Sequence, residues 1–330
     1  MVQTLTLINY YNLFYYLPTQ FAGDPTQLLV VDTGSSDTWA RGTTCVSIDE
    51  SCVGNKMGLG GTFTNLNFEE TYGDGSVVSG GIYFGSPNFN GLSCPLLYYG
   101  NMTEMNGWAD ESSDGIVGLA QISSSIIYEK TQIRQSFFIY SLGYTQFGLY
   151  FNNFENETSL DSQLSLGGYD PSRYQGSITW IPTNDANYWQ MSVVGGTVNV
   201  FGNIYPIDSA TVTNIVFDTG SVVNVLPLNA INGICSNIVG CAYDDTFAKY
   251  VFPCTSILPN LQFNIGGHTW IIPGFHYSSN YSTEEVGDLC TVLMQENTAL
   301  DLDIFGTSFF RAYYTAFDLT NGQFGYAIPN

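Results

Sequence analysis

The sequence predicts a mainly β protein built from two similar halves. Short runs of Val, Ile, Thr, Phe and Tyr alternate with Gly, Asn, Asp or Pro from end to end, which is typical of many short strands joined by turns. The four-residue word Asp-Thr-Gly-Ser occurs at residues 32–35 and again at 218–221. A chance repeat of such a word within 330 residues is improbable, so we interpret the two halves as duplicated.

Local patterns predict mostly strands and two short helices. Residues 1–17 are rich in β-branched and aromatic residues, and we expect them to form the first strand. The clearest helical segment is residues 128–143, in which apolar residues recur at helical spacing and Gly143 supplies a stop. A second short helix is expected after Leu228. Neither helical segment carries an obvious chemical group.

A further repeated pattern follows each Asp-Thr-Gly-Ser word. Asp, apolar residues and Gly occur in DGIVGLA at 114–120 and in DIFGTSF at 303–309. The boundary between the halves is expected near residues 176–186, where strand and turn signals occur together. We therefore assign residues 1–178 to an N-terminal lobe and residues 179–330 to a C-terminal lobe, each with one of the two Asp residues.

The charge of the chain excludes some classes of partner. Lys and Arg number 7 against 29 Asp and Glu, which gives a net charge of −22. Nucleic acids and anionic membranes would repel such a chain, so neither is expected as a partner. Protonation of the carboxylates relieves the repulsion, which indicates tolerance of mildly acidic conditions. No apolar run reaches the roughly 20 residues that a membrane span requires.

The seven cysteines indicate an oxidising compartment. Two pairs have the close spacing of local disulfides, and a third pair can close a longer loop. These pairs are Cys45 with Cys52, Cys235 with Cys241, and Cys254 with Cys290. Cys94 is left over, and a buried thiol is favoured over pairing between chains.

Three glycosylation sequons are consistent with the same compartment. They begin at Asn101, Asn156 and Asn280. Residues 1–17 lack basic residues and a small-residue cleavage site, so they do not resemble a signal peptide. We expect a secreted, lysosomal or vacuolar glycoprotein whose signal and pro-segment are not visible in this chain.

The repeated word offers chemistry if its two copies meet. Asp32 and Asp218 within hydrogen-bond reach would share one proton, so that one acts as base and the other as acid. The base would take a proton from a bridging water, and the acid would bind the carbonyl oxygen that the water attacks. The result is amide hydrolysis without a covalent intermediate.

The residues beside each Asp suit that task. Glycines permit a turn whose backbone N–H groups approach the carboxylate, serines can donate to its outer oxygen, and threonines can cross-link the two loops. These supporting residues are Thr33, Gly34, Ser35, Thr219, Gly220 and Ser221.

Other readings of the same residues are weaker. A single Asp-Thr-Gly turn often only caps backbone N–H groups, but a matched pair favours catalysis. His268 and His276 have no Cys or carboxylate cluster at metal-ligand spacing, so no metal is expected. No G-x-S-x-G elbow supports a serine hydrolase, and no dinucleotide loop is present, so no cofactor is expected.

With these motifs the chain resembles the pepsin-like aspartic proteases. The resemblance rests on VVDTGSSDTW, VFDTGS, TYGDGSVVSG at 71–80, DGIVGLA, and the closing DIFGTSFFRAYYTAFDLTNGQFGYAIP. It implies an all-β bilobal fold with pseudo-two-fold related lobes, a few short helices and a cleft for an extended peptide. It also implies that Asp32 and Asp218 are the catalytic dyad and that Tyr72 belongs to a β-hairpin flap braced by Trp39. Substrate contacts are expected from Gly73, Asp74, Val30 and Ile116.

The resemblance predicts an aspartic-type endopeptidase (EC 3.4.23 class), a monomer made as a zymogen. It would cut extended polypeptides beside hydrophobic residues, at acidic pH. The alternative is a catalytically inactive pepsin-fold protein that binds peptides or proteins. The chain departs from the family pattern at Asp37, at Ala40-Arg41 and at Ser113, which leaves its specificity open.

Overall fold

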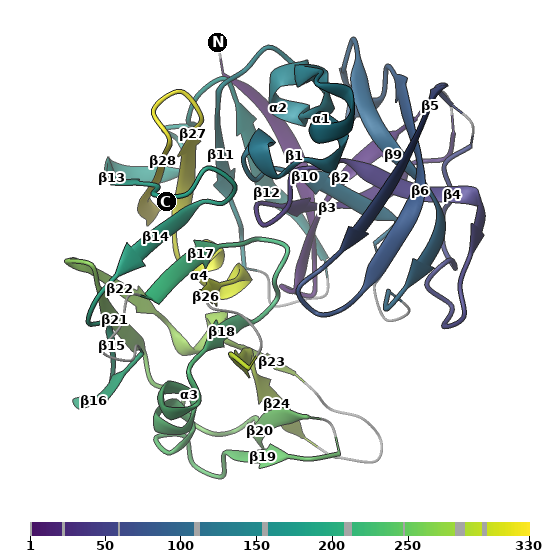
Figure 1. Cartoon of the computed structure of the whole chain (residues 1–330). Coiled ribbons are helices and arrows are strands. Elements are labelled where there is room, and N and C mark those ends of the chain that lie inside the picture. Colours follow the sequence, from purple (N-terminus) through teal and green to yellow (C-terminus); the bar gives the residue numbers. More distant parts are fainter. Residues whose placement is uncertain are drawn as a thin grey trace. The chain divides into compact units, whose positions relative to one another are not determined.

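The computed structural model of the chain describes residues 2–21, 24–58, 60–108, 113–153, 158–207, 213–246, 248–280, 288–298 and 302–330. Strands predominate and helices are few and short, so the predicted all-β class is confirmed. The chain forms two compact units (Figure 1). Unit 1 comprises Met1–Trp189 and Tyr314–Asn330, and unit 2 comprises Gln190–Tyr313.

Unit 1 is built on one large sheet with the strand order β13-β28-β27-β11-β12-β1-β2-β3-β10-β4-β9-β6-β5. A small β7-β8 hairpin pairs with β2. The strands are β1 (Gln3–Tyr10), β2 (Phe14–Gln20), β3 (Gln27–Asp32), β4 (Trp39–Val46), β5 (Thr62–Thr71), β6 (Val77–Gly85), β7 (Asn88–Phe89), β8 (Leu92–Ser93), β9 (Leu97–Asn106), β10 (Gly115–Gly118), β11 (Gln146–Tyr150), β12 (Thr158–Leu166), β13 (Tyr174–Pro182), β27 (Tyr314–Asp318) and β28 (Gln323–Pro329).

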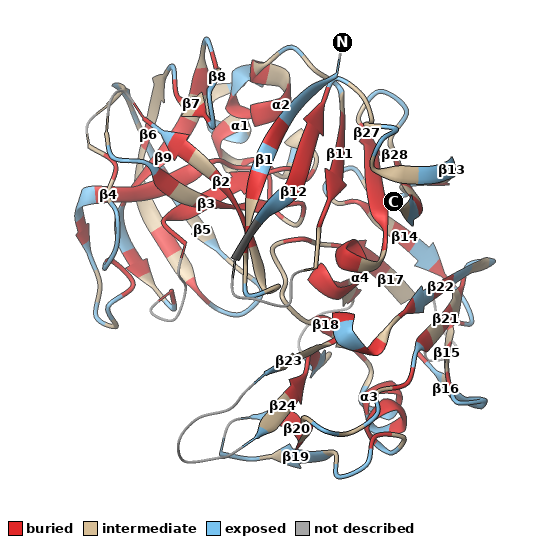
Figure 2. Cartoon of the chain, turned by 180° about the vertical axis from the view of Figure 1, so that it is seen from behind, coloured by how far each residue is buried: buried red, intermediate tan, exposed pale blue. Residues whose placement is uncertain are grey.

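The last two strands of the chain complete this sheet. β27 pairs with β11, and β28 pairs with both β27 and β13. All five residues of β27 and four of the five in β11 are buried, as the red strands of Figure 2 show. The closing strands of the chain therefore belong to the core of unit 1.

Residues 1–17, expected as one strand, form β1 and most of β2. Tyr11 and Asn12 separate the strands with φ angles of 53° and 60°, in the left-handed region that ends an extended run. β1 then pairs antiparallel with β2.

The predicted helix at 128–143 is broken into three short pieces. These are α1 (Ile126–Thr131), η2 (Arg134–Ser136) and α2 (Phe138–Ser141), with η1 (Ile122–Ser124) before them. Ser125 caps α1 by accepting a hydrogen bond from the backbone N–H of Tyr128. Gln132 ends α1 in the left-handed conformation, with φ 57°, so the helical pattern does not continue as one helix.

Unit 2 contains three smaller sheets, ordered β14-β17-β26-β18-β25, β16-β15-β21-β22 and β19-β20-β24-β23. The strands are β14 (Gln190–Val193), β15 (Thr197–Val200), β16 (Asn203–Pro206), β17 (Thr213–Phe217), β18 (Asn224–Leu226), β19 (Ala242–Asp244), β20 (Lys249–Pro253), β21 (Leu261–Ile265), β22 (His268–Ile272), β23 (Ser278–Asn280), β24 (Leu289–Val292), β25 (Met294–Glu296) and β26 (Leu302–Phe305). The helices are α3 (Leu228–Cys235), η3 (Gly274–His276) and α4 (Thr307–Ala312), and α3 confirms the helix expected after Leu228.

Three disulfides are present, and they join the three pairs expected from spacing. The bonds are Cys45–Cys52, Cys235–Cys241 and Cys254–Cys290. Cys94 is a buried free thiol whose Sγ lies 3.1 Å from Oγ of Ser141. Disulfides of this number indicate a protein of the secretory pathway or the extracellular space.

The sequons differ in accessibility. Asn101 lies within β9, is only 4% exposed and donates its side-chain amide to the carbonyl of Gly58, so the folded protein does not present it for glycosylation. Asn280 is exposed at the end of β23, while Asn156 lies outside the described residues. Among the helices of the described residues, none has the length and apolar character needed to cross a membrane.

Candidate active site

A five-stranded motif occurs once in each unit. In unit 1 the order is β2-β3-β10-β4-β9, and in unit 2 it is β14-β17-β26-β18-β25. Successive pairs along each motif are antiparallel, parallel, antiparallel and parallel. Both Asp-Thr-Gly-Ser turns leave the second strand of their motif, at the end of β3 and just after β17. The repeated word therefore has a repeated structural setting.

A glycine lies near each Asp, as the last residue of the neighbouring parallel strand in unit 1 and directly after that strand in unit 2. Gly118 is the partner of Asp32, and Gly306 follows Phe305, the partner of Phe217. A Cβ atom on Gly118 would come within 2.3 Å of the Ser36 backbone, and one on Gly306 within 2.3 Å of the Val223 carbonyl oxygen. The loop after each Asp passes too close for a side chain, which explains the glycine shared by DGIVGLA and DIFGTSF.

The first turn holds the Asp32 carboxylate with two groups from its own loop. The backbone N–H of Gly34 donates to Oδ1 over 2.7 Å, and the hydroxyl of Ser35 donates to Oδ2. Backbone bonds from Leu119 to the Asp32 carbonyl (2.6 Å) and from Ala120 to the Ser35 carbonyl (2.8 Å) fix the turn to the end of β10. Both carboxylate oxygens are thus oriented by hydrogen bonds.

The second turn repeats the hydrogen bond from glycine and a backbone bond to the serine carbonyl, whereas its serine hydroxyl has a different acceptor. The Gly220 N–H donates to Oδ1 of Asp218 over 2.8 Å, and the Thr307 N–H donates to the Ser221 carbonyl over 2.9 Å. The Ser221 hydroxyl donates to the carbonyl of Val223 (2.9 Å), whereas its counterpart Ser35 donates to a carboxylate. The donation expected from Ser221 to the outer oxygen of its Asp is replaced by this backbone bond.

The threonines beside the two Asp residues are both buried, Thr33 in unit 1 and Thr219 in unit 2. A buried threonine next to each carboxylate suits the supporting role expected for this pair, which stays a prediction.

The predicted flap is a β-hairpin formed by β5 and β6. Its tip is a tight turn in which the Gly75 N–H donates to the Tyr72 carbonyl and the Tyr72 N–H donates to the Ser76 carbonyl, each over 2.9 Å. Gly75 has φ 88°, which glycine adopts without strain. Gly73 and Asp74 are exposed at the tip. The tip is therefore open to an incoming chain.

Tyr72 is held from two sides within unit 1. The indole Nε1 of Trp39 donates to the Tyr72 hydroxyl over 2.6 Å, and this hydroxyl donates to Oε2 of Glu70 over 3.0 Å. Trp108 packs edge-on against both aromatic rings, with centroid distances of 5.2 Å. Burial, followed by the charges of Glu70 and Asp32, raises the pKa of Tyr72 well above its ordinary value, so the hydroxyl stays protonated.

Glu70 and Trp108 were not predicted as site residues. A signal for Glu70 exists in the sequence, because Leu66, Phe68, Glu70 and Tyr72 alternate with exposed residues and therefore share the inward face of β5. Trp108 gives no such signal, since it lies beyond the end of β9.

One buried and one half-buried carboxyl group, Asp37 and Glu70, lie in this part of unit 1. Burial raises the pKa of Asp37 to about 7, although hydrogen bonds from Ser125 and the N–H groups of Ile126 and Ile127 oppose the shift. Burial also raises the pKa of Glu70 to about 8, with a further contribution from Asp37. Both groups are therefore neutral in acidic solution.

Val30 and Ile116, expected to line the main substrate pocket, face each other across the parallel pair β3 and β10. Each is 4% exposed, and both belong to an apolar cluster that includes Trp39 and Trp108, with Tyr72 packed against it. Their position brings them close to the flap residues, and a role in binding substrate stays a prediction.

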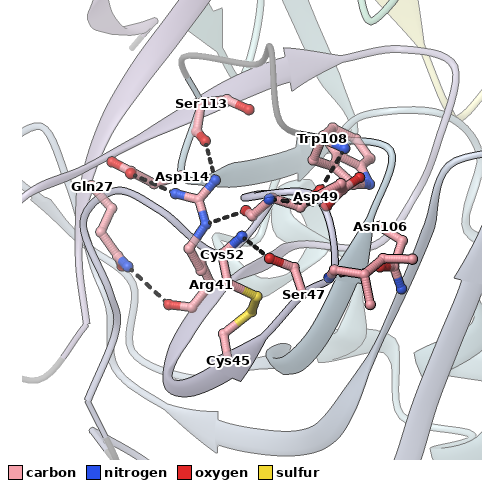
Figure 3. Close-up of a disulfide and its surroundings, with 12 residues drawn as sticks. Gln27, Arg41, Cys45, Ser47, Asp49, Cys52, Asn106, Trp108, Ser113 and Asp114 are labelled. Carbon is pink, nitrogen blue, oxygen red and sulfur yellow. Dashed lines mark hydrogen bonds and ion pairs between the residues drawn. A yellow bond between two sulfur atoms is a disulfide. The ribbon is translucent and has the colours of Figure 1, made fainter.

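Arg41 and Ser113, two departures from the family pattern, belong to one buried network (Figure 3). The Arg41 guanidinium contacts the Asp114 carboxylate at 3.1 Å and donates to the carbonyls of Ser51 and Ser113. Asp114 also accepts from the backbone N–H of Leu28 and from Asn55. This network ties the Cys45–Cys52 loop to the start of β10, beside Ile116.

No cluster of three or more potential metal ligands occurs among the described residues. The groups around each Asp turn are carboxylates, hydroxyls and backbone N–H groups, which suit acid–base chemistry.

The profile of the family described as eukaryotic aspartyl protease matches residues 15–328. The chain belongs to this family. Penicillopepsin-1 from Penicillium janthinellum is 26% identical over 327 residues, which cover 94% of each chain. Embryonic pepsinogen from Gallus gallus is 28% identical over 348 residues, covering 99% of this chain and 83% of its own. Aspergillopepsin-1 from Aspergillus oryzae is 26% identical, with 94% and 78% covered.

The match to the family covers nearly the whole chain. The predicted enzyme class, an aspartic-type endopeptidase, is therefore confirmed at the level of the family. The family acts on polypeptides, as expected.

Proposed function

We propose that the chain is an aspartic endopeptidase in which Asp32 and Asp218 form the catalytic dyad. The substrates are extended polypeptides with hydrophobic residues around the bond that is cut. The N-terminal lobe would carry the first Asp and the flap, the C-terminal lobe would carry the second Asp, and the enzyme would act as a monomer at acidic pH.

One observation carries this proposal. Both Asp residues occupy the same place in the same five-stranded motif, with the same glycine N–H bound to Oδ1 and a glycine at the end of the adjacent strand. A turn that only capped a strand end would need no second copy with matching surroundings. Matched copies are what a symmetric pair of carboxylates requires.

The reaction follows from two carboxyl groups that share one proton. The ionised Asp removes a proton from a water molecule, whose oxygen attacks the carbonyl carbon of the peptide bond. The protonated Asp hydrogen-bonds to the carbonyl oxygen, which stabilises the negative charge that develops there. The tetrahedral intermediate collapses as the nitrogen accepts the proton that the ionised Asp took from the water, and the C–N bond breaks to give a carboxylic acid and an amine. No covalent bond to the enzyme forms.

Features of unit 1 favour an extended, partly apolar substrate beneath the flap. Gly73 and Asp74 are exposed at the hairpin tip, where backbone groups can bind a strand-like peptide. Val30, Ile116 and Tyr72 supply apolar surface beside the Asp32 turn.

Acidic working conditions agree with the charges of the chain. A net charge of −22 at neutral pH falls as carboxylates are protonated, and the buried carboxyl groups of Asp37 and Glu70 are most easily accommodated when neutral. A lysosomal, vacuolar or extracellular location is part of the same proposal, as is synthesis as a zymogen.

The test is cleavage of a denatured protein by the mature enzyme across acidic and neutral pH. We expect activity that a statine-type peptide inhibits and that Asp32→Asn or Asp218→Asn lowers by at least about a thousandfold. Asp161→Asn, on an exposed side chain of unit 1, is the control and should retain full activity. A correctly folded wild type that binds the inhibitor but cleaves nothing would instead favour the peptide-binding alternative.

A further inference from the structure

Glu70 occupies an unusual place for an acidic residue. It lies on β5 directly opposite Val78, on the inward face that also carries Phe68. Val78 and Phe68 are fully buried, whereas Glu69 points to the other face and is exposed. The carboxyl group of Glu70 is therefore directed into the apolar layer beneath the flap.

This carboxyl group completes the hydrogen bonding of Tyr72. The phenolic oxygen accepts the Trp39 N–H at 2.6 Å, and its proton is donated to Glu70 at 3.0 Å. Two strands, β4 and β5, thus fix the same hydroxyl. Without Glu70 the tyrosine keeps only the bond from Trp39.

The surroundings favour the neutral form of Glu70. Asp32 and Asp37 lie close enough to repel a negative charge there. Helix α1, which packs on β5, brings Glu129 and Lys130, but the Lys130 ammonium is bound to the carbonyl of Asn67. Neither of the two ion pairs in the described part of the chain includes Glu70. β6 contributes Tyr83, at the far end of the hairpin opposite Phe63.

Ionisation of Glu70 therefore creates a charge without a cation beside two other carboxylates. β5 is the last strand of its sheet, and Glu70 is near the tip of the hairpin. The hydrogen bond from Tyr72 opposes the cost of this ionisation, because the donated proton favours the ionised form of Glu70. The bond to Tyr72 therefore does not require Glu70 to be neutral.

We propose that Glu70 is a positioning residue for the flap tyrosine: its carboxyl oxygen accepts the Tyr72 proton and, together with the Trp39 N–H, fixes the place of the tyrosine ring. The inference rests on the proposed function, in which the substrate lies beneath the flap. Its consequence is that any acceptor oxygen at residue 70 keeps the flap tyrosine in place.

Three variants test this role. Glu70→Gln keeps an acceptor oxygen for the Tyr72 proton, Glu70→Leu removes it, and Glu69→Gln changes the adjacent exposed residue as a control. The measurement is kcat/KM at acidic pH for an unstructured peptide with apolar residues around the cut bond, as a ratio to wild type.

In acid, we expect Glu70→Gln to stay within about twofold of wild type and Glu70→Leu to fall about fivefold, the value of one hydrogen bond. The Glu69→Gln variant should equal wild type. The tryptophan fluorescence of Glu70→Leu should differ from that of wild type, because Trp39 loses a fixed partner, and that of Glu70→Gln should not.

A Glu70→Leu variant equal to Glu70→Gln overturns the inference while leaving the protease assignment intact. An inactive wild type refutes the proposed function instead. The fluorescence of the variants then decides alone whether Glu70 positions Tyr72.

Discussion

The guanidinium of Arg41 and the carboxylate of Asp114 form an ion pair, 3.1 Å apart, whose side chains are only 2% and 6% exposed. Removing two charges from water is costly, and the cost is offset only when the remaining donors and acceptors are satisfied. Here Arg41 also donates to two backbone carbonyls, and Asp114 accepts from Leu28 and Asn55 (Figure 3). The pair therefore fixes the position at which β10 begins, directly after Asp114.

Breaking this pair on one side should destabilise the protein strongly. Asp114→Asn leaves the buried Arg41 charge without a counterion, and Arg41→Met leaves the buried Asp114 charge without one. For each variant we expect a loss of about 3–5 kcal/mol in the free energy of unfolding. Urea denaturation measures it. The double variant should lose less than the sum of the single losses.

The exposed pair Arg173–Asp161 is the control, because its side chains are 27% and 52% exposed. Asp161→Asn should cost less than about 1 kcal/mol. Equal losses at the buried and exposed pairs would show that burial is not what makes Arg41 and Asp114 important.

Asp37 should make the stability of the protein fall as the pH rises. Its pKa is about 7 in the fold against 3.8 when unfolded, mainly because it is buried. Between these values the folded state holds a proton that the unfolded state has released, so raising the pH favours unfolding, by up to about 1.4 kcal/mol per pH unit. Asp37→Asn cannot ionise. Its single side-chain oxygen replaces only one of the two carboxylate oxygens that accept from the Ile126 and Ile127 N–H groups, and the cost of the lost bond is the same at every pH.

The variant should therefore gain stability relative to wild type between about pH 4 and about pH 7, as followed by thermal unfolding. Asp49→Asn should show no such gain, because hydrogen bonds from Ser51 and Gly107 lower the pKa of Asp49. A difference between Asp37→Asn and wild type that is the same at every pH would contradict the prediction.

Trp39→Phe should weaken the placement of Tyr72 while keeping an aromatic ring in the cluster. The loss of one hydrogen bond, about 1–1.5 kcal/mol, corresponds to a five- to tenfold fall in kcat/KM for a peptide substrate. The matched control is Trp108→Phe, since the Trp108 Nε1 is buried with no hydrogen-bond partner in the described residues. That variant should lose less than about threefold, and an equal loss in both would mean that ring packing, rather than the N–H donor, positions Tyr72.

The sequence predicts best what depends on neighbouring residues. The two Asp-Thr-Gly-Ser turns, the glycine after each parallel strand and the helix at Leu228 are all readable from short words, as is the spacing of the local disulfides. The prediction of one helix at 128–143 was wrong, because the periodic pattern does not reveal that Gln132 adopts the left-handed conformation.

Contacts between residues that are far apart in the chain could not be predicted from the sequence. Arg41 was recognised only as a departure from a familiar pattern, because its partner Asp114 is 73 residues away. Likewise, the Ser221 hydroxyl donates to a backbone carbonyl because the loop brings Val223 close to it. The four-residue word shared by the two turns does not determine the course of that loop.

The pairing of β27 with β11 and of β28 with β13 has a consequence for biosynthesis. A growing chain leaves the ribosome from its N-terminal end, so the sheet of unit 1 lacks its final strands until residues 314–330 emerge. Unit 2, whose residues are contiguous in the chain, can be completed earlier. The first half to be translated is thus the last to be finished, and until then the open edge of β11 is a site where nascent chains can associate wrongly.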